Sequence, residues 1–247
     1  WAAYALARSA RERRQPLDLD LPERKLKLGP DGRVEKVVVP ARLDAHRLIE
    51  EFMILANVAA AESLESKRQA LIYRAHDAPS LAKLESLREF LRTLEISLAK
   101  SGTLRPSHFN GILSQVKASE HESLVNEVVL RSQSQAVYSP DNIGHFGLNL
   151  DRYAHFTSPI RRYADLIVHR ALVTAFDLGE GGLSREDEEN LQATAEEISR
   201  AERRAMAAER DTVDRLIAHH LADRVGEDFD GRITGVTKAG LFVVLPA

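Results

Sequence analysis

The residues best suited to chemistry lie between residues 144 and 170. Two adjacent arginines, Arg161 and Arg162, follow Ser158 and a proline, a pair that commonly begins an α-helix. Free backbone amides, the positive end of a helix dipole and two guanidinium groups together form an anion site, and phosphate suits such a site. The structural alternative is that an arginine pairs with Asp165 or with a neighbouring helix. The residues alone favour neither.

Aromatic rings crowd the same stretch, at Phe146, Tyr153, Phe156 and Tyr163. Rings beside arginines can stack on the bases of a single-stranded nucleic acid while the cations follow its phosphates. The competing interpretation is that these rings belong to the core. We expect this for at least two of Phe146, Phe156 and Tyr163.

A second group of polar residues lies on one face of a helix expected over residues 41–67. Glu50 and Asn57 are seven residues apart there, beside a run of apolar residues at 52–61. A buried carboxylate needs a partner, so this face indicates either a contact to a substrate sugar or base, or a structural ion pair. Glu209 lies in a charged helix expected over residues 184–223, where most charges should be solvated.

The elements that must position these residues follow from hydrophobic periodicity, which predicts an α+β chain that is mostly helical. The 52–61 segment is apolar almost all round, so its helix should be central and run through the middle of the domain, with the helix opened by Pro159 beside it. The expected helices are 3–14, 41–67, 79–98, 106–118, 121–137, 159–179 and 184–223. The expected strands are a hairpin within 17–39, a short strand at 71–75, and strands at 228–235 and 240–245.

The composition sets limits on the function. With 44% hydrophobic and 29% charged residues the chain can bury a core, and its net charge of −3 excludes a uniformly basic nucleic-acid binder. It contains no cysteine, which excludes disulfides and thiolate metal sites and fits a cytoplasmic protein. No apolar run approaches the roughly 18–20 residues that span a bilayer, so no membrane partner is expected.

Four stretches carry motifs in a fixed order, at residues 48–57, 73–80, 145–170 and 207–211. The most specific reads HFGL followed by YAHFTSPIRRY, within residues 145–170. Their order and spacing resemble the ribonuclease II/ribonuclease R family, which is defined by the RNB catalytic domain. The stretches around residues 76–79 and 138–145 are more similar to the ribonuclease R branch.

This resemblance implies a fold and an activity. Residues 1–225 would be the C-terminal portion of an RNB catalytic domain, and residues 226–247 the first strands of an OB-fold RNA-binding domain. The family hydrolyses single-stranded RNA processively from its 3′ end to nucleoside 5′-monophosphates, with magnesium held by a cluster of aspartates. In the family that cluster lies upstream of the segment seen here. Asp18 and Asp20 match no catalytic position, so we expect no metal ligands in this chain.

The resemblance also implies roles for individual residues. Arg161 matches the arginine that stabilises the scissile phosphate, and Glu50 matches a glutamate that contacts the 3′-terminal nucleotide. Glu209 matches a glutamate near the active site that influences turnover and RNA binding. Arg162 and Tyr163 belong to the motif, and we group them with the RNA-binding residues.

Other interpretations and the state of the chain stay open. The chain could hold single-stranded RNA without cutting it, or it could be a helical interaction scaffold if the motif match is a coincidence. It begins at Trp1 within a helical pattern and stops at Ala247 just after a strand-like run. We therefore expect a piece of a longer, monomeric enzyme that is inactive when isolated.

Overall fold

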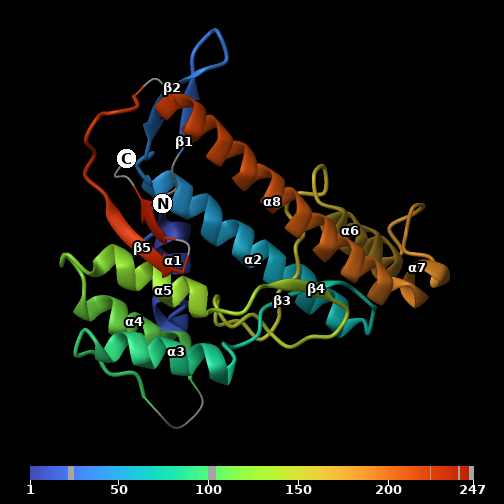
Figure 1. The fold of residues 1–247 in the computed structure, drawn as a ribbon. Coiled ribbons are helices and arrows are strands. Elements are labelled where there is room, and N and C mark those ends of the chain that lie inside the picture. The colour runs from blue at the N-terminus through green and yellow to red at the C-terminus, as the bar shows by residue number, and fades with distance from the viewer. Residues whose placement is uncertain (22–24, 100–103, 223, 239, 245–247) are drawn as a thin grey trace. The chain divides into compact units, whose positions relative to one another are not determined.

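The structure, a computed structural model, describes residues 1–21, 25–99, 104–222, 224–238 and 240–244. Most of these residues are helical (Figure 1). The helices are α1 (Ala2–Arg14), α2 (Asp44–Ser66), α3 (Leu81–Arg92), α4 (Pro106–Gln115), α5 (Glu122–Ser132), α6 (Tyr163–Phe176), α7 (Arg185–Glu189) and α8 (Leu191–Ala222). The predicted α+β, mostly helical composition is confirmed.

The strands pair as short antiparallel ribbons. They are β1 (Lys25–Leu28), β2 (Val34–Val38), β3 (Tyr73–Ala75), β4 (Val137–Ser139), β5 (Arg232–Thr237) and β6 (Gly240–Val244). The pairs are β1 with β2, β3 with β4, and β5 with β6. The β3–β4 pair was not predicted, because residues 121–137 were expected to be one helix. That helix ends at Ser132, and Gln133 turns the backbone into an extended conformation.

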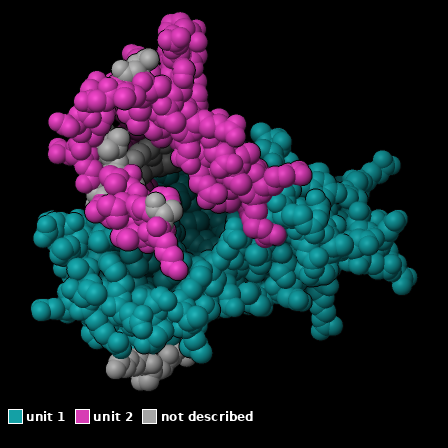
Figure 2. Space-filling view, in the orientation of Figure 1, with its two compact units in different colours: residues 1–20, 43–201 teal, residues 21–42, 202–247 magenta. Residues whose placement is uncertain are grey.

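The chain folds as two compact units (Figure 2). The first unit holds residues 1–20 and 43–201, and the second holds residues 21–42 and 202–247. The division expected from the resemblance, at residues 225 and 226, stays a prediction. The β5–β6 hairpin lies where the first OB-fold strands are expected, although residues 239 and 245–247 of that segment lie outside the described residues.

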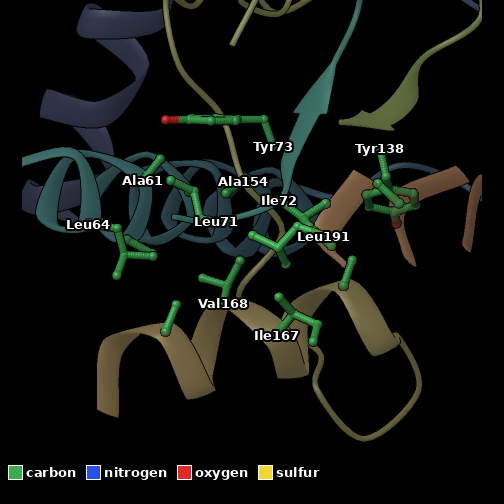
Figure 3. Close-up of a cluster of buried hydrophobic side chains, with 14 of the residues drawn as sticks. Ala61, Leu64, Leu71, Ile72, Tyr73, Tyr138, Ala154, Ile167, Val168 and Leu191 are labelled. Atoms are coloured by element: carbon green, nitrogen blue, oxygen red, sulfur yellow. The ribbon is translucent and has the colours of Figure 1, made fainter. Parts of the chain in front are cut away.

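The main core of the first unit forms where α2, α6 and β3 meet (Figure 3). Ala61 and Leu64 on α2 face Ile167 and Val168 on α6, and all four side chains are buried. Ala61 and Leu64 are three residues apart, and Ile167 and Val168 follow the buried Ala164 by three and four residues, so each helix presents one stripe. The prediction that these two helices pack beside each other is confirmed.

α2 buries one face against the main core and not its whole circumference. Ile54 is 5% exposed, but Phe52 and Leu55 are 40% and 46% exposed. A helix presents only the residues of one stripe to a core on one side. On α2 that stripe runs through Ile54, Asn57, Ala61 and Leu64, as their burial shows.

A second core joins α3, α4 and α5. Leu87, Phe109 and Val125 are almost fully buried in it. The hydroxyl of Ser80 accepts a hydrogen bond from the backbone N–H of Lys83 and caps the start of α3. This helix ends at Arg92, before the predicted end near residue 98, because residues 93–95 form a turn.

Candidate functional site

The two arginines of the motif lie in a turn and not in a helix. α6 begins at Tyr163, and Arg162 before it has an extended backbone, with φ −125° and ψ 119°. The backbone N–H groups of Arg161 and Arg162 both donate to the carbonyl of Ser158, at 3.3 and 3.1 Å. The prediction that a helix starts at Pro159, with Arg161 in its first turn, is therefore wrong.

A buried carboxylate explains where α6 starts. Asp165 is fully buried, and its Oδ1 accepts the backbone N–H of Ser158 at 2.7 Å. Arg162 donates to both oxygens of the same carboxylate, through Nε at 2.7 Å and Nη2 at 2.8 Å. Burial lowers the pKa of Arg162, but the bonds to Asp165 outweigh it and the pKa is raised.

The structure thus separates two residues that the sequence treated as a pair. Arg162 takes the structural role, with Asp165 as its partner. Arg161 is exposed, and within the described residues its guanidinium forms no ion pair. The neighbouring Ile160 is 97% exposed, so the tip of the turn faces solvent.

Aromatic and imidazole rings form a connected array in the segment before this turn. The ring centroids of Tyr138 and His155 are 5.6 Å apart, and those of His155 and Tyr153 are 5.7 Å apart. The array continues from Tyr153 to His145 at 5.3 Å and from His145 to His76 at 4.9 Å. These contacts join β3, β4 and the loop at 144–156.

Two histidines of this array, His145 and His155, are held neutral. Burial lowers the pKa of His155 to about 3, helped by the positive charges of Arg162, Arg74 and Arg161. Burial also lowers the pKa of His145 to about 3, with further contributions from His76 and Arg74. Neutral rings can accept hydrogen bonds, and His145 Nδ1 accepts one from the backbone N–H of Leu148 at 3.1 Å.

His76, the residue after β3, holds the loop at 144–156 through hydrogen bonds of its ring. Its Nε2 donates to the carbonyl of Ser134 at 2.8 Å, and its Nδ1 accepts from the N–H of Gly147 at 2.9 Å. A Cβ at Gly147 would lie only 3.0 Å from the His76 ring. Any other residue at this position would require the His76 ring to shift, which accounts for the glycine in the HFGL motif.

Asn57 has a structural role that the sequence left open. This buried amide donates to the Tyr153 hydroxyl at 2.9 Å and accepts the backbone N–H of Phe156 at 3.0 Å. It therefore joins α2 to the loop before the arginine turn. Phe156 packs against the main core and Phe146 against the second core, so the prediction that two of the rings are structural is confirmed. Tyr163 is exposed.

The buried acid on α2 is the neighbour of Glu50, a residue that the sequence analysis did not single out. Glu51 is the buried acid, and its Oε1 accepts from Arg11 Nη1 at 3.0 Å while Arg14 lies 3.8 Å from its Oε2. Glu50 is partly exposed, and its Oε1 lies 3.9 Å from the same Arg11 nitrogen. Sequence reasoning missed Glu51, although an acid at the edge of an apolar run signals a buried pair.

The predicted site residues lie in both units. Glu50, Arg161, Arg162 and Tyr163 belong to the first unit, whereas Glu209 is an exposed residue on α8 in the second unit. The structure therefore does not place Glu209 relative to the others.

The described residues do not fit the magnesium that the family resemblance implies. Among them, no group of three or more His, Asp or Glu side chains could hold a metal ion. Asp18 pairs with Arg11 at 3.2 Å, so we derive no step through a metal bound by this chain. None of the described helices is long and apolar enough to span a membrane.

Comparison with known proteins shows the family. A model of the RNB domain matches residues 2–177. Ribonuclease R of Vibrio cholerae is 38% identical over 251 residues, covering 98% of this chain and 31% of that protein. Ribonuclease R of Escherichia coli is 39% identical with the same coverage. This chain thus spans about a third of the length of these curated relatives.

Solved structures agree. The apo form of Mycoplasma genitalium RNase R superposes with a TM-score of 0.91 at 29% identity, covering 98% of this chain and 38% of that one. The same protein has also been solved in complex with ribose-methylated single-stranded RNA, where the TM-score is 0.89 at 28% identity and the coverage is again 98% and 38%. The motif, the fold and these matches agree over nearly the whole chain, and this protein belongs to the RNB family, with ribonuclease R proteins as its relatives.

Proposed function

We propose that this chain is part of a 3′→5′ exoribonuclease that degrades single-stranded RNA processively to nucleoside 5′-monophosphates. The observation that carries the proposal is the exposed Arg161 on a turn fastened to the core, in a chain that belongs to the RNB family. The RNA complex of the Mycoplasma genitalium relative supports RNA as the ligand.

Arg161 is proposed to contact the scissile phosphate. A guanidinium presents two parallel N–H groups to two phosphate oxygens, a geometry that lysine cannot copy. As the attacking oxygen adds to phosphorus, negative charge grows on the non-bridging oxygens. A preorganised donor therefore stabilises the transition state more strongly than it stabilises the ground state. The exposed side chain of Arg161 leaves its fork accessible to such a ligand.

The other site residues are proposed to hold the RNA around that phosphate. The partly exposed carboxylate of Glu50 can accept hydrogen bonds from ribose hydroxyls of the 3′-terminal nucleotide. The exposed ring of Tyr163 can stack on a base. Arg162 adds positive charge beside the turn, and Glu209 is proposed to influence turnover from α8.

The chain is proposed to act within a polypeptide as long as its relatives. Catalytic magnesium, which would activate water and stabilise phosphate charge, would be held by aspartates outside these 247 residues. We therefore propose that the isolated chain is inactive, that residues 226–247 start an OB-fold, and that the enzyme is a cytoplasmic monomer. The β5–β6 hairpin supports the OB-fold assignment.

The test is degradation of a 5′-labelled single-stranded RNA with magnesium. The longer protein, of the same length as the ribonuclease R relatives, should shorten the RNA from the 3′ end and release mononucleotides. The 247-residue chain should not. RNA binding without cleavage by the longer protein would favour the binding-module alternative. Cleavage by the isolated chain, in a preparation free of other nucleases, would show that the active site is complete within it.

A further inference from the structure

One buried carboxylate holds both ends of the turn that carries Arg161. We propose that Asp165 is the positioning residue for Arg161, fixing the direction in which its guanidinium meets the RNA phosphate. The inference rests on the proposed function, because it concerns the same phosphate contact.

Asp165 joins the residue that begins the turn to the residue that ends it. Its Oδ1 accepts from the backbone N–H of Ser158 at 2.7 Å and from Arg162 Nη2 at 2.8 Å. Its Oδ2 accepts from Arg162 Nε at 2.7 Å. Both oxygens are thus used, and Arg161 lies between the two anchored residues.

The rest of the turn is held more weakly. Proline at position 159 has no backbone N–H to donate. Ile160 is almost fully exposed, so its side chain gains little from packing. The backbone N–H groups of Arg161 and Arg162 share one acceptor, the Ser158 carbonyl, at 3.3 and 3.1 Å. The hydrogen bonds to the Asp165 carboxylate are shorter, and hydrogen bonds to a charged group are stronger than those between neutral groups.

Asp165 is itself on a rigid support. It lies in the first turn of α6, whose Ala164, Ile167 and Val168 are buried in the main core. The backbone of Arg161 is therefore tied to the core although its side chain is in solvent. Catalysis by a forked donor depends on direction, and a displacement of about 1 Å can cost about 100-fold in rate.

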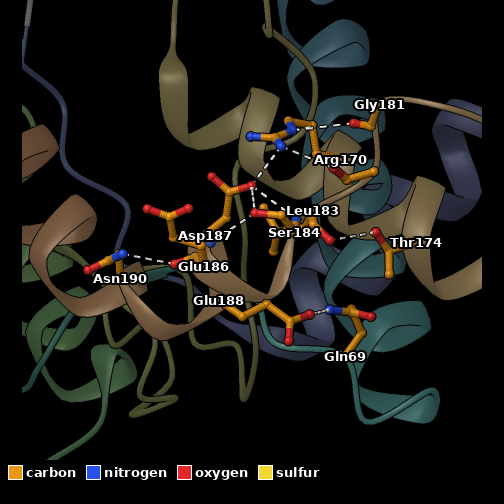
Figure 4. A network of polar contacts seen from close by, with 11 residues as sticks. Gln69, Arg170, Thr174, Gly181, Leu183, Ser184, Glu186, Asp187, Glu188 and Asn190 are labelled. Carbon is orange, nitrogen blue, oxygen red and sulfur yellow. Dashed lines mark hydrogen bonds and ion pairs between the residues drawn. The ribbon is translucent and has the colours of Figure 1, made fainter.

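The same chemistry occurs at a second place in the first unit (Figure 4). Asp187 Oδ2 accepts from the backbone N–H of Ser184 at 2.9 Å and from Arg170 Nη2 at 2.7 Å. This aspartate fastens the start of α7, and none of the proposed site residues takes part. Asp187→Asn is therefore a matched control for Asp165→Asn.

The experiment is a double-mutant cycle in the longer protein, which has the length of the ribonuclease R relatives. Asp165→Asn keeps an oxygen for Ser158 but loses the charge that holds Arg162. It should slow single-turnover cleavage of a short RNA roughly 10- to 100-fold. RNA affinity, measured in EDTA, should stay within about threefold, because many phosphate contacts hold the RNA. In an Arg161→Ala background the same change should have almost no further effect, since the group it positions is gone.

A second variant covers the case in which Asp165→Asn does not fold, as judged by thermal melting. Arg162→Lys keeps a cation beside Asp165 but cannot bond both oxygens with one planar fork. It should slow cleavage and show the same non-additivity with Arg161→Ala.

The outcomes separate the two proposals. If Arg161→Ala cleaves at the parental rate, the phosphate role of Arg161 is overturned and this inference goes with it. If Arg161→Ala cleaves slowly while the rate losses of Asp165→Asn and Arg161→Ala multiply in the double variant, only the positioning role of Asp165 is overturned. Parental cleavage by a folded Asp165→Asn variant, or an equal loss in Asp187→Asn, also overturns it.

Discussion

Arg161 and Arg162 have the same chemistry and different surroundings. Arg162 has two of its guanidinium nitrogens bonded to the buried Asp165, and Arg161 is exposed with its fork unoccupied by any described acid. A cation two residues before the first helical residue gains nothing from the helix dipole. This environment supports the phosphate contact that we propose for Arg161.

At Arg161 we expect replacement to affect rate more than binding. Arg161→Ala should lower the single-turnover rate about 100- to 1000-fold, as for loss of other preorganised donors. Arg161→Lys should restore only part, because an ammonium cannot bond two oxygens in the same way. Arg185→Ala, at an exposed arginine on α7, is the control. Equal losses of rate and affinity in Arg161→Ala would instead indicate a binding contact.

At the scale of elements, α2 and the loop before α6 are joined through one amide. Asn57 satisfies the backbone N–H of Phe156 and bonds the Tyr153 hydroxyl, both from within the protein interior. This link connects the helix that carries Glu50 with the segment that leads to Arg161.

Removal of that link should destabilise the fold. Asn57→Ala leaves the Phe156 N–H buried without a partner, so we expect a loss of about 2 kcal/mol in the free energy of unfolding. Urea denaturation of the isolated chain measures it. Met53→Ala, at an exposed position on the same helix, should cost much less. A similar loss of unfolding free energy in both variants would mean that Asn57 does not link α2 to the loop before α6.

The histidine array makes the loop sensitive to acid. His145 and His155 have pKa values of about 3 in the folded chain, against 6.5 for an unperturbed histidine. Between these values the unfolded chain binds more protons. The free energy of unfolding should therefore fall as pH drops below 6.5, by at most about 1.4 kcal/mol per pH unit for each histidine.

Unfolding measured from about pH 7 to about pH 5 tests this, in the range just below the ordinary histidine pKa. His145→Asn, whose amide oxygen can still accept from Leu148, should make the pH dependence shallower. His219→Asn changes an exposed histidine and should leave it unchanged. Parallel pH profiles for all three proteins would show that His145 is not held neutral by burial.

At the scale of the whole molecule, charge is local. The net charge is −3, so the proposed RNA binding would come from arginines gathered at particular places and not from the overall field. Arg74, Arg161 and Arg162 all lie close enough to His155 to lower its pKa, which marks one such place.

The RNA affinity of the isolated 247-residue chain should therefore depend on salt through few contacts. Each phosphate that is neutralised should add about −0.7 to the slope of log affinity against log salt concentration for a single strand. Changing Arg161 to Ala should make the slope shallower by about one contact. Changing Arg185 to Ala should not. A slope near zero for the parent would exclude this region as the binding surface.

The sequence by itself determined what depends on neighbours along the chain. Periodicity located the helices, and the helix expected from residue 184 begins there, where Ser184 and Asp187 form a capping box at the start of α7. The hairpin expected within residues 17–39 is the β1–β2 pair. The motif at 145–170 was sufficient for the family, because a long match without gaps is specific.

The tertiary structure alone decided which polar residues are structural and which are free to bind. Asn57 meets its partners nearly a hundred residues away, and Glu51 meets Arg11 across forty residues. Such contacts leave no periodic signal. The start of α6 at Tyr163 depends on contacts that are local in the sequence, from Ser158 and Arg162 to Asp165, but only the tertiary structure buries that carboxylate. Local helix preference gives way when a buried charge must be satisfied.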